Sequence, residues 1–317
     1  MKILILGGAG FLGTNLTHRC LKDVDNKVTV LDLLDPRLKS TREHLDALGD
    51  KITFIEGDIR DFELMKKVVQ GQDVIFNCAG QTSHPLSLKD PLFDADVNCK
   101  GNLVVLEAIR ECNPDAKVIY ASSSTVIGKA IYDVVDETHP EAPLEIYSAN
   151  KGVAEKYYEI YHQVHGLHTL SLRFANLYGP YGKGYPEFGF INYFISVAQA
   201  DEEITIYGDG AQTRNVMYVE DACDLMYRCI ECAEMHGGVY FAVHREHYSI
   251  KQIAQTIVDV LKTGKLTQVP WPEMRKKIEI DDVIISDKKL FEHIKFRPQY
   301  TLESGLQKMA EMRVVNS

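Results

Sequence analysis

The stretch Gly7-Gly8-Ala9-Gly10-Phe11-Leu12-Gly13 decides the fold. It follows the apolar run Ile3–Leu6 at once and leads into a helical pattern over Leu12–Leu21. Glycines let a backbone turn sharply and approach a pyrophosphate, and a helix N-terminus offers amides and the positive end of its dipole. The spacing is G-x-x-G-x-x-G, not the G-x-G-x-x-G of the general dinucleotide fingerprint, so a plain turn is the competing interpretation.

Asp32 favours the dinucleotide interpretation. It ends the next apolar run, Lys27–Leu31, about 20 residues after the glycines, where a carboxylate accepts from both ribose hydroxyls and repels a 2′-phosphate. The sequence therefore predicts NAD rather than NADP as cofactor. The alternative is that Asp32 is a solvated residue at a strand end.

Short β-rich runs alternate with longer helical patterns through the first half of the chain. The predicted strands are nearly continuous apolar runs, as expected for strands that are buried on both faces of a parallel sheet. They are Ile3–Leu6, Lys27–Leu31, Ile52–Ile55, Asp73–Asn77, Lys117–Ala121 and Thr169–Arg173. The predicted helices are Leu12–Leu21, Leu38–Leu48, Phe62–Gln70, Leu92–Cys112 and Ser148–Val164. This alternation predicts an α/β fold with a Rossmann-type, doubly wound parallel sheet.

The pattern changes after Asn176. A loop rich in Gly, Pro and aromatic residues runs from Tyr178 to Gly189, and shorter elements follow it. We predict these elements at Phe190–Ala200, Ile204–Tyr207, Val216–Val219 and Ile250–Leu261. The expected division is a dinucleotide-binding domain over 1–175 and a smaller C-terminal α/β substrate domain over 176–317, with some later strands rejoining the first sheet.

Charge and cysteine content narrow the class of protein. The formal net charge of −10 argues against nucleic acid or an acidic membrane as a partner, because both require a basic face. No apolar run approaches the roughly 20 residues of a membrane helix. Seven cysteines, an odd number, favour free thiols and a cytoplasmic protein. Cys229 and Cys232 form a C-x-x-C at helical spacing, which we interpret as core packing, and no metal site is expected.

Two groups of residues carry possible catalytic chemistry. Tyr147 and Lys151 form a Y-x-x-x-K pattern on a predicted helix, which places both side chains on one face. An ammonium and a cationic nicotinamide would lower the pKa of the phenol and make it a base. The run Ser122–Thr125 lies just beyond the fifth strand, at the edge of the sheet where ligands bind. The alternative for Tyr147 and Lys151 is an ordinary pair of surface residues, and the alternative for the serines is a role in a turn or a helix cap.

Together with other motifs, these residues resemble the extended short-chain dehydrogenases/reductases, the NAD-dependent epimerases, dehydratases and reductases of nucleotide sugars. The motifs follow one another in order over nearly the whole chain. They are Gly7–Gly13, Asp32, Gly57–Asp61, Cys78–Gly80, Asn98 with Gly101, Ser122–Gly128, Tyr147 with Lys151, Arg173–Pro180 and Gly208–Arg214.

The resemblance implies a role for each matching residue. Around NAD it places Gly7, Gly10, Phe11, Leu12, Gly13, Asp32, Asp58, Ile59, Ala79, Gly80, Tyr147 and Lys151. Within that set, the amides of Phe11 and Leu12 would meet the pyrophosphate, and Lys151 would also bond the nicotinamide ribose. For a nucleotide-diphosphate sugar it implies Ser124, Asn176, Arg214, a loosely aligned Arg275, and His84 as a contact or auxiliary acid/base. A structural loop role is the alternative for His84.

The serine motif narrows the expected reaction. Ser123 stands four residues before Ile127, a position that usually holds Tyr in this family, and would share the proton with Tyr147. The 4,6-dehydratases carry an Asp-Glu pair, and the uronate decarboxylases a Glu, where this chain has Ser124 and Thr125. The resemblance therefore implies an epimerase that acts first of all at C4. A C2-epimerase of a CDP-sugar, a net dehydrogenase or reductase, and a non-catalytic NAD-sensing protein remain the alternatives.

Three departures from the family pattern bear on the substrate: Ile127, Asn215 in place of an Asp, and Ala242–His244 in place of Asn-x-Gly.

We also expect a homodimer. The long helical patterns carry surplus apolar and aromatic residues, including Tyr157, Tyr158 and Tyr161, and in relatives the matching helices form a four-helix interface.

Overall fold

A seven-stranded parallel sheet forms the centre of the computed structural model, which describes residues 1–273, 276 and 282–316. Its strand order is β10-β6-β5-β4-β1-β2-β3. The strands are β1 (Lys2–Leu6), β2 (Lys27–Asp32), β3 (Ile52–Glu56), β4 (Val74–Asn77), β5 (Lys117–Ser123), β6 (His168–Phe174) and β10 (Val239–Ala242). The predicted Rossmann-type fold is confirmed. The order reverses between β1 and β4, and in such sheets ligands bind beyond the carboxyl ends of the strands at this point.

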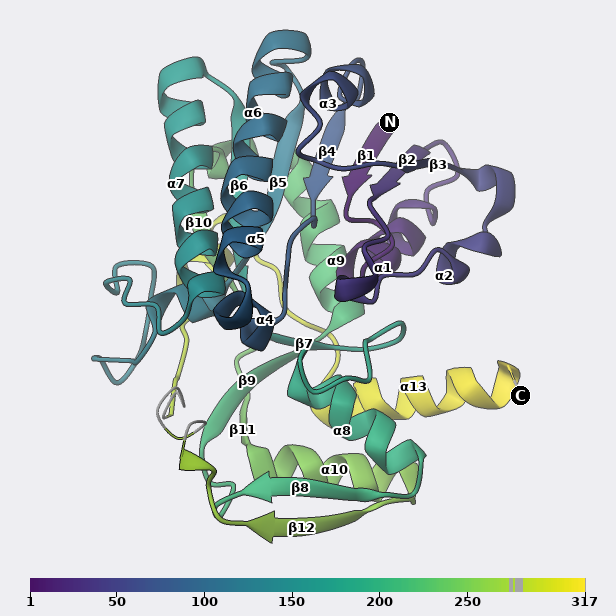
Figure 1. Ribbon diagram of the computed structural model, residues 1–317, viewed down its shortest axis with the longest axis vertical. Coiled ribbons are helices and arrows are strands. Elements are labelled where there is room, and N and C mark those ends of the chain that lie inside the picture. The colour runs from purple at the N-terminus through teal and green to yellow at the C-terminus, as the bar shows by residue number, and fades with distance from the viewer. Residues whose placement is uncertain (274–275, 277–281, 317) are drawn as a thin grey trace.

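Helices cover both faces of this sheet (Figure 1). On one face, α1 (Phe11–Cys20), α9 (Val219–Arg228) and α12 (Lys288–Ile294) bury their apolar residues. On the other face, α3 (Phe62–Val68), α6 (Gly101–Cys112) and α7 (Ile146–His165) do the same. Alternate residues of β1 belong to the two cores, Ile3 and Ile5 to one, Leu4 and Leu6 to the other, which explains its unbroken apolar run.

The remaining elements form a smaller part, drawn below the sheet in Figure 1. Three strands pair in the order β11-β9-β7, and β12 pairs with β8. The strands are β7 (Asn176–Tyr178), β8 (Glu203–Tyr207), β9 (Thr213–Tyr218), β11 (His247–Ser249) and β12 (Lys265–Val269). The helices are α8 (Phe190–Gln199), α10 (Ile250–Leu261) and α13 (Leu302–Asn316). Although they follow residue 176, β10 is a strand of the large sheet and α9 packs on that sheet. The chain therefore passes between the two parts more than once. The boundary at 175 stays a prediction.

Two predicted helices differ from the structure. The span Leu38–Leu48 holds only the end of a 3-10 turn, η1 (Pro36–Leu38), and a single helical turn, α2 (Glu43–Asp46), because Lys39 takes a positive φ of 53° between them. The span Leu92–Cys112 is divided into α5 (Pro91–Ala95), a π-helical turn η3 (Asp96–Lys100) and α6. A further short helix, α4 (His84–Lys89), precedes them. The remaining short turns are η2 (Gly49–Lys51), η4 (Ser124–Ile127), η5 (Cys229–Glu231) and η6 (Ala233–Met235).

Two tyrosines that we took as surplus on α7 lie in the core. Tyr158 is 1% exposed and stacks on Tyr120, with ring centroids 4.6 Å apart. Tyr161 is also buried, and its hydroxyl donates to Glu107 at 2.5 Å. They pack toward the sheet because the helix buries a wider stripe than we assumed. Cys229 and Cys232 pack in the core as predicted. Within the part of the chain that is described, no helix is both long and apolar enough to cross a membrane.

Candidate active site

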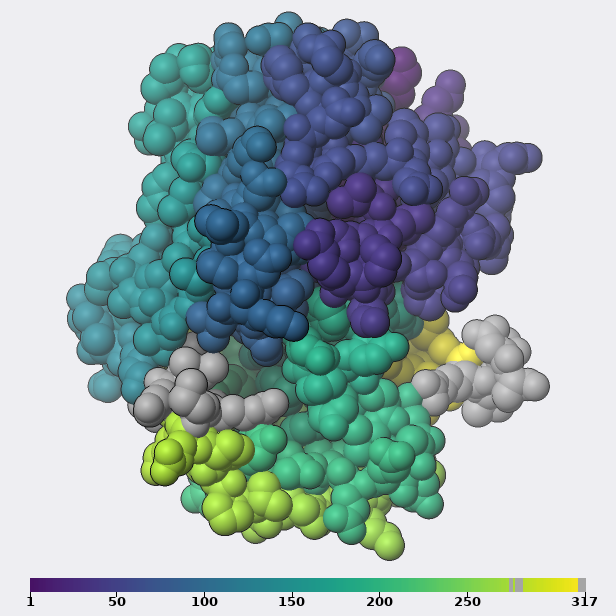
Figure 2. All heavy atoms as spheres, viewed as in Figure 1, coloured from purple at the N-terminus to yellow at the C-terminus, as the bar shows by residue number. Residues whose placement is uncertain are grey.

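A cavity of about 360 Å³ lies over the carboxyl ends of the central strands and is lined by both parts of the chain. Figure 2 shows the two parts from the front, with the N-terminal residues in purple and blue above the C-terminal residues in green. The cavity gathers seventeen of the eighteen predicted site residues. They are Gly7, Gly10, Phe11, Leu12, Gly13, Asp32, Asp58, Ile59, Ala79, Gly80, His84, Ser123, Ser124, Tyr147, Lys151, Asn176 and Arg214. Arg275 lies outside the described residues.

The glycine turn brings three backbone segments into close approach. A Cβ on Gly7, whose φ is +73°, would lie 2.6 Å from the Ala79 backbone, and one on Gly13 would lie 2.3 Å from the Gly7 carbonyl oxygen. Gly10 is the N-cap of α1 and offers no side chain to the first amides of the helix. These amides have no partner within the helix. The turn therefore fits the pyrophosphate of a dinucleotide.

The carboxylate of Asp32 is held in one orientation at the end of β2. It is buried and accepts hydrogen bonds from the amides of Ala9 at 3.0 Å and Leu34 at 2.9 Å. The Ser40 hydroxyl adds a contact at 3.3 Å. This carboxylate lies beside the glycine turn, so it suits the ribose hydroxyls of NAD.

Lys183 is a cavity residue that sequence reasoning missed. It comes from the loop after β7, and its ammonium donates a hydrogen bond to the Leu38 carbonyl on the opposite wall. Burial lowers the pKa of Lys183 to about 8, although the charge of Asp32 acts in the opposite direction. No motif marks this lysine, because its contact joins residues 145 positions apart in the chain.

Asp58 and Gly80 occupy two other walls. Burial raises the pKa of Asp58, but hydrogen bonds and charge from Arg60 outweigh burial and lower it overall. Arg60 also bonds Asp96 at 3.0 Å, which ties the turn after β3 to η3. A Cβ on Gly80 would lie 2.8 Å from Oδ1 of Asn98, so glycine keeps this wall open.

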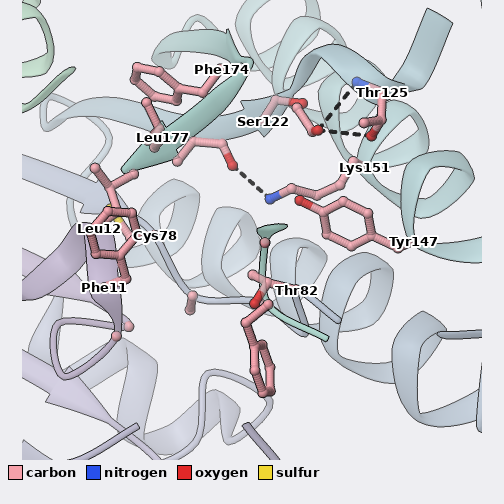
Figure 3. A pocket seen from close by; sticks show the side chains of 18 of the residues that line it. Phe11, Leu12, Cys78, Thr82, Ser122, Thr125, Tyr147, Lys151, Phe174 and Leu177 are labelled. Carbon is pink, nitrogen blue, oxygen red and sulfur yellow. Dashed lines mark hydrogen bonds between the residues drawn. The ribbon is translucent and has the colours of Figure 1, made fainter. Parts of the chain in front are cut away.

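Tyr147 and Lys151 project from the first turns of α7 into the same part of the cavity (Figure 3). Ser123 lines the same part of the cavity, and its hydroxyl acts to lower the pKa of Tyr147 because it favours the ionised phenol. The ammonium of Lys151 donates to the Ala121 carbonyl at 2.6 Å and lies 4.4 Å from the centre of the Tyr120 ring. The three predicted catalytic residues thus meet at the ends of β5 and α7.

Burial governs the titration of this pair. It lowers the pKa of Lys151 to about 8. It raises the pKa of Tyr147 well above 10, more than the Ser123 hydroxyl lowers it. The expected lowering of the Tyr147 pKa by Lys151 is therefore not found in the chain itself, because desolvation of the phenolate is the larger effect. The nicotinamide is the other cation of that expectation, and it belongs to the cofactor.

Glu145 is a second residue that sequence reasoning missed. It is the N-cap of α7, and its carboxylate accepts from the amides of Tyr147 at 2.9 Å and Ser148 at 3.1 Å. Nδ1 of His84 lies 3.1 Å from Oε1 of the same carboxylate. The His84 ring also packs on the Tyr147 ring, with centroids 4.7 Å apart. Glu145 gave no signal in the sequence because its contact to His84 spans 61 residues.

The opposite wall comes from the C-terminal part. Asn176 on β7 donates to the Asn215 carbonyl at 2.9 Å, and Nη1 of Arg214 on β9 donates to the Thr213 carbonyl at 2.7 Å. Both residues line the cavity, as Ser124 does. Amide and guanidinium groups suit a diphosphate.

Two of the residues that depart from the family pattern, Asn215 and Ile127, make clear contacts in the structure. Asn215 is buried and joins β9 to the following turn: its Oδ1 accepts from the amide of His244 at 3.1 Å, and its Nδ2 donates to the carbonyl of Glu246 at 3.2 Å. Ile127 is buried in an apolar cluster with Val283 and Ile285, and all three line the cavity. An apolar side chain therefore replaces a phenol where its neighbours are apolar.

The chain is similar to known nucleotide-sugar enzymes in sequence and in structure. The model of the NAD dependent epimerase/dehydratase family matches residues 3–242. A putative UDP-glucose 4-epimerase of Methanocaldococcus jannaschii is 33% identical over 220 residues, which cover 69% of this chain and 70% of that protein. The CDP-paratose 2-epimerase of Salmonella typhi is 27% identical over 339 residues, 98% of each chain. The crystal structure of a Thermotoga maritima UDP-glucose 4-epimerase with UDP-glucose has a TM-score of 0.90, at 26% identity over the full length of both chains.

The family match covers most of the chain, and the glycine turn and Asp32 supply the groups that its cofactor, NAD, requires. The chain belongs to the NAD dependent epimerase/dehydratase family, an extended short-chain dehydrogenase/reductase family of nucleotide-sugar enzymes.

Proposed function

We propose that the protein epimerises a nucleotide-diphosphate sugar at C4 through a transient keto-sugar. The observation that carries this proposal is the composition of the catalytic cluster. Tyr147, Lys151 and Ser123 meet in one cavity, and neither Ser124 nor Thr125 supplies the acid or base that elimination or decarboxylation would require.

The residues of the chain divide the work. Tyr147 removes the proton of the sugar hydroxyl and later returns it, with Ser123 sharing that proton. Lys151, in the same part of the cavity, would bond the nicotinamide ribose of the cofactor beside Tyr147. The glycine turn and Asp32 would hold NAD, which would supply the acceptor and donor of the hydride exchanged with the sugar carbon. Asn176 and Arg214 hold the diphosphate, so the sugar is free to turn between the two hydride transfers.

A second candidate is a C2-epimerase of a CDP-sugar. It is favoured by the Salmonella enzyme, whose similarity spans 98% of this chain. The same catalytic cluster serves either carbon, because the position of the sugar relative to Tyr147 decides which hydroxyl loses its proton.

The test is a panel of UDP-, dTDP-, CDP- and GDP-sugars, incubated with the purified protein without added NAD and followed by NMR. We expect one nucleotide sugar to be converted into its C4 epimer. A C2 epimer would establish the second candidate. Net oxidation or reduction that needs added cofactor, or no turnover of any member, would contradict epimerisation. Tyr147→Phe is the control, and it should lose about 100- to 10,000-fold in turnover while it still binds the nucleotide.

We further propose a homodimer formed through α6 and α7. With Tyr158 and Tyr161 in the core, the support comes from Val153, Ile160 and Val164, which are 40%, 47% and 67% exposed on α7. The seven free cysteines suit a reducing compartment, which supports a cytoplasmic location.

A further inference from the structure

Three branched apolar side chains form one wall of the cavity. Ile127, Val283 and Ile285 are 2%, 9% and 7% exposed, belong to one apolar cluster and all line the cavity. Ile127 ends η4, and the other two residues precede α12 in the chain. We call these three residues the apolar wall. Their side chains have no hydrogen-bond donor or acceptor, so they recognise a ligand by shape and apolar contact.

One edge of the apolar wall adjoins the catalytic cluster. Ile127 is the last residue of η4, and Ser123 is the N-cap of the same turn. Oγ1 of Thr125, inside this turn, lies 2.6 Å from Oγ of Ser148, the residue that follows Tyr147 on α7. The turn that carries Ile127 is therefore held beside the first turn of the helix that carries the proposed base.

The other edge adjoins the residue that we assign to the diphosphate. Oδ1 of Asp282 accepts from the amide of Thr213 at 2.6 Å and from its hydroxyl at 3.0 Å. Asp282 directly precedes Val283, and Thr213 directly precedes Arg214. A sugar whose diphosphate lies at Arg214 and whose reacting carbon lies at Tyr147 would therefore lie along the apolar wall.

Backbone groups beside the wall already have partners within the chain. The amide of Ile285 donates to Nε2 of His247 at 3.2 Å. The carbonyl of Ile284 accepts from the amide of Val135 at 2.8 Å. A sugar hydroxyl that points at the wall would lose its water and gain no hydrogen bond from these groups, which costs free energy. A methyl group in the same place would bury apolar surface, which is favourable.

We propose that the apolar wall is the subsite for C6 of the sugar and that the substrate is a nucleotide-diphosphate 6-deoxyhexose. C6 is the position of a hexose where removal of a hydroxyl leaves a methyl group, whereas removal from a ring carbon leaves hydrogens. A methyl group matches three branched apolar side chains in size and polarity. This inference rests on the proposed function and names the substrate class of that same site.

The apolar wall should favour the 6-deoxy sugar by about 10- to 100-fold in affinity, which is what an apolar pocket achieves against an added hydroxyl. The experiment uses NAD-loaded protein with Tyr147→Phe, which should bind the sugar without converting it. Calorimetry compares nucleotide sugars in pairs that differ by a single oxygen atom. The pairs are glucose with 6-deoxyglucose and galactose with 6-deoxygalactose, each linked to UDP, dTDP, CDP and GDP. We expect the 6-deoxy member to bind more tightly in every pair that binds.

Adding a hydroxyl to the wall should weaken this preference. Val283→Thr keeps the shape of the side chain and gives the C6 hydroxyl a partner. The preference should fall by about 5-fold, the value of one neutral hydrogen bond. Ile127→Thr should act in the same direction. Val134→Thr makes the same exchange at a residue that is 54% exposed and lies outside the cavity, so it should leave the preference unchanged. Normal NAD content reports an intact fold in each variant.

Two results would overturn the subsite and leave epimerisation standing. One is equal or tighter binding of the hydroxylated member in every pair. The other is a preference for the 6-deoxy member that stays unchanged in both Val283→Thr and Ile127→Thr, because the wall would not be its source. If no pair binds, the inference and the proposed function are both wrong. A 6-deoxy preference together with net oxidation or reduction by the unmodified protein would refute epimerisation and support the subsite.

Discussion

Arg173 and Glu155 form a buried ion pair that joins β6 to the helix that carries Tyr147 and Lys151. Nη2 of Arg173 lies 2.7 Å from Oε2 of Glu155, and Nε lies 3.0 Å from Oε1. The two side chains are 4% and 0% exposed. The Ser122 hydroxyl donates to the same carboxylate at 2.5 Å, so the end of β5, where Ser123 begins the catalytic cluster, is tied to the pair.

Replacing Arg173 should therefore destabilise the fold strongly. Arg173→Met leaves the Glu155 carboxylate buried without its cation, which costs about 3 to 5 kcal/mol. Urea denaturation measures the change in the free energy of unfolding. Arg42→Met, which removes an exposed pair with Asp46, is the control and should cost about 1 kcal/mol or less. Equal losses in the two variants would show that the buried pair has no special weight.

The preference for NAD should depend on Asp32. Asp32→Ser removes the carboxylate that we assign to the ribose hydroxyls of NAD. It also removes the negative charge that acts on the Lys183 ammonium in the cavity. We expect weaker binding of NAD and tighter binding of NADP to the cofactor-free protein, measured by calorimetry. Asp50→Ser, on the exposed turn η2, should change neither affinity. Binding of NADP to the unmodified protein at least as tightly as NAD would refute this role.

The depressed pKa of Lys151 should appear in the pH dependence of stability. Its pKa is lowered to about 8 from an ordinary value of 10.5. Between these values the folded, cofactor-free protein binds fewer protons at this site than the unfolded chain, so the contribution of Lys151 to the free energy of unfolding rises with pH. Denaturation across this window should show the unmodified protein gaining stability relative to Lys151→Met. A difference that does not vary with pH would mean that Lys151 titrates normally.

The outer face of α7 should control assembly. Ile160→Glu places a charge among the exposed apolar residues that we assign to the dimer interface, and it should convert the dimer to a monomer in light scattering. Val24→Glu is the control, since Val24 is 90% exposed in the turn between α1 and β2. If the unmodified protein is a monomer at micromolar concentration, the proposed dimer interface is wrong.

Six strands of the large sheet could be predicted from sequence because the pattern that marks them is local, whereas β10 was not predicted. Strands buried on both faces appear as continuous apolar runs, and the glycine turn follows β1 directly. The prediction of one helix over Leu38–Leu48 was wrong, because this segment has too little buried apolar surface to hold a helix. Only Leu45 of α2 is buried, so no apolar face holds the segment in one helix, and the backbone turns at Lys39.

The sequence predicted the site residues that belong to family motifs. It did not predict the residues whose contacts join segments far apart in the chain. The resemblance places Tyr147 and Asp32 in the cavity because each belongs to a motif. Lys183 reaches Leu38, and Glu145 reaches His84, through contacts that no spacing rule anticipates. The raised pKa of Tyr147 was also outside the reach of sequence, because it depends on how deeply the phenol is buried.

The most direct measurement follows the hydrogen on C4 of the sugar. UDP-glucose carrying deuterium at C4, or the nucleotide sugar that the panel identifies, is incubated with NAD-loaded protein and no added cofactor. The account predicts that the 4-epimer forms with its deuterium retained at C4, and that the bound NAD is neither consumed nor left reduced. Loss of the deuterium, or one equivalent of lasting NADH for each sugar converted, would contradict epimerisation by a returned hydride.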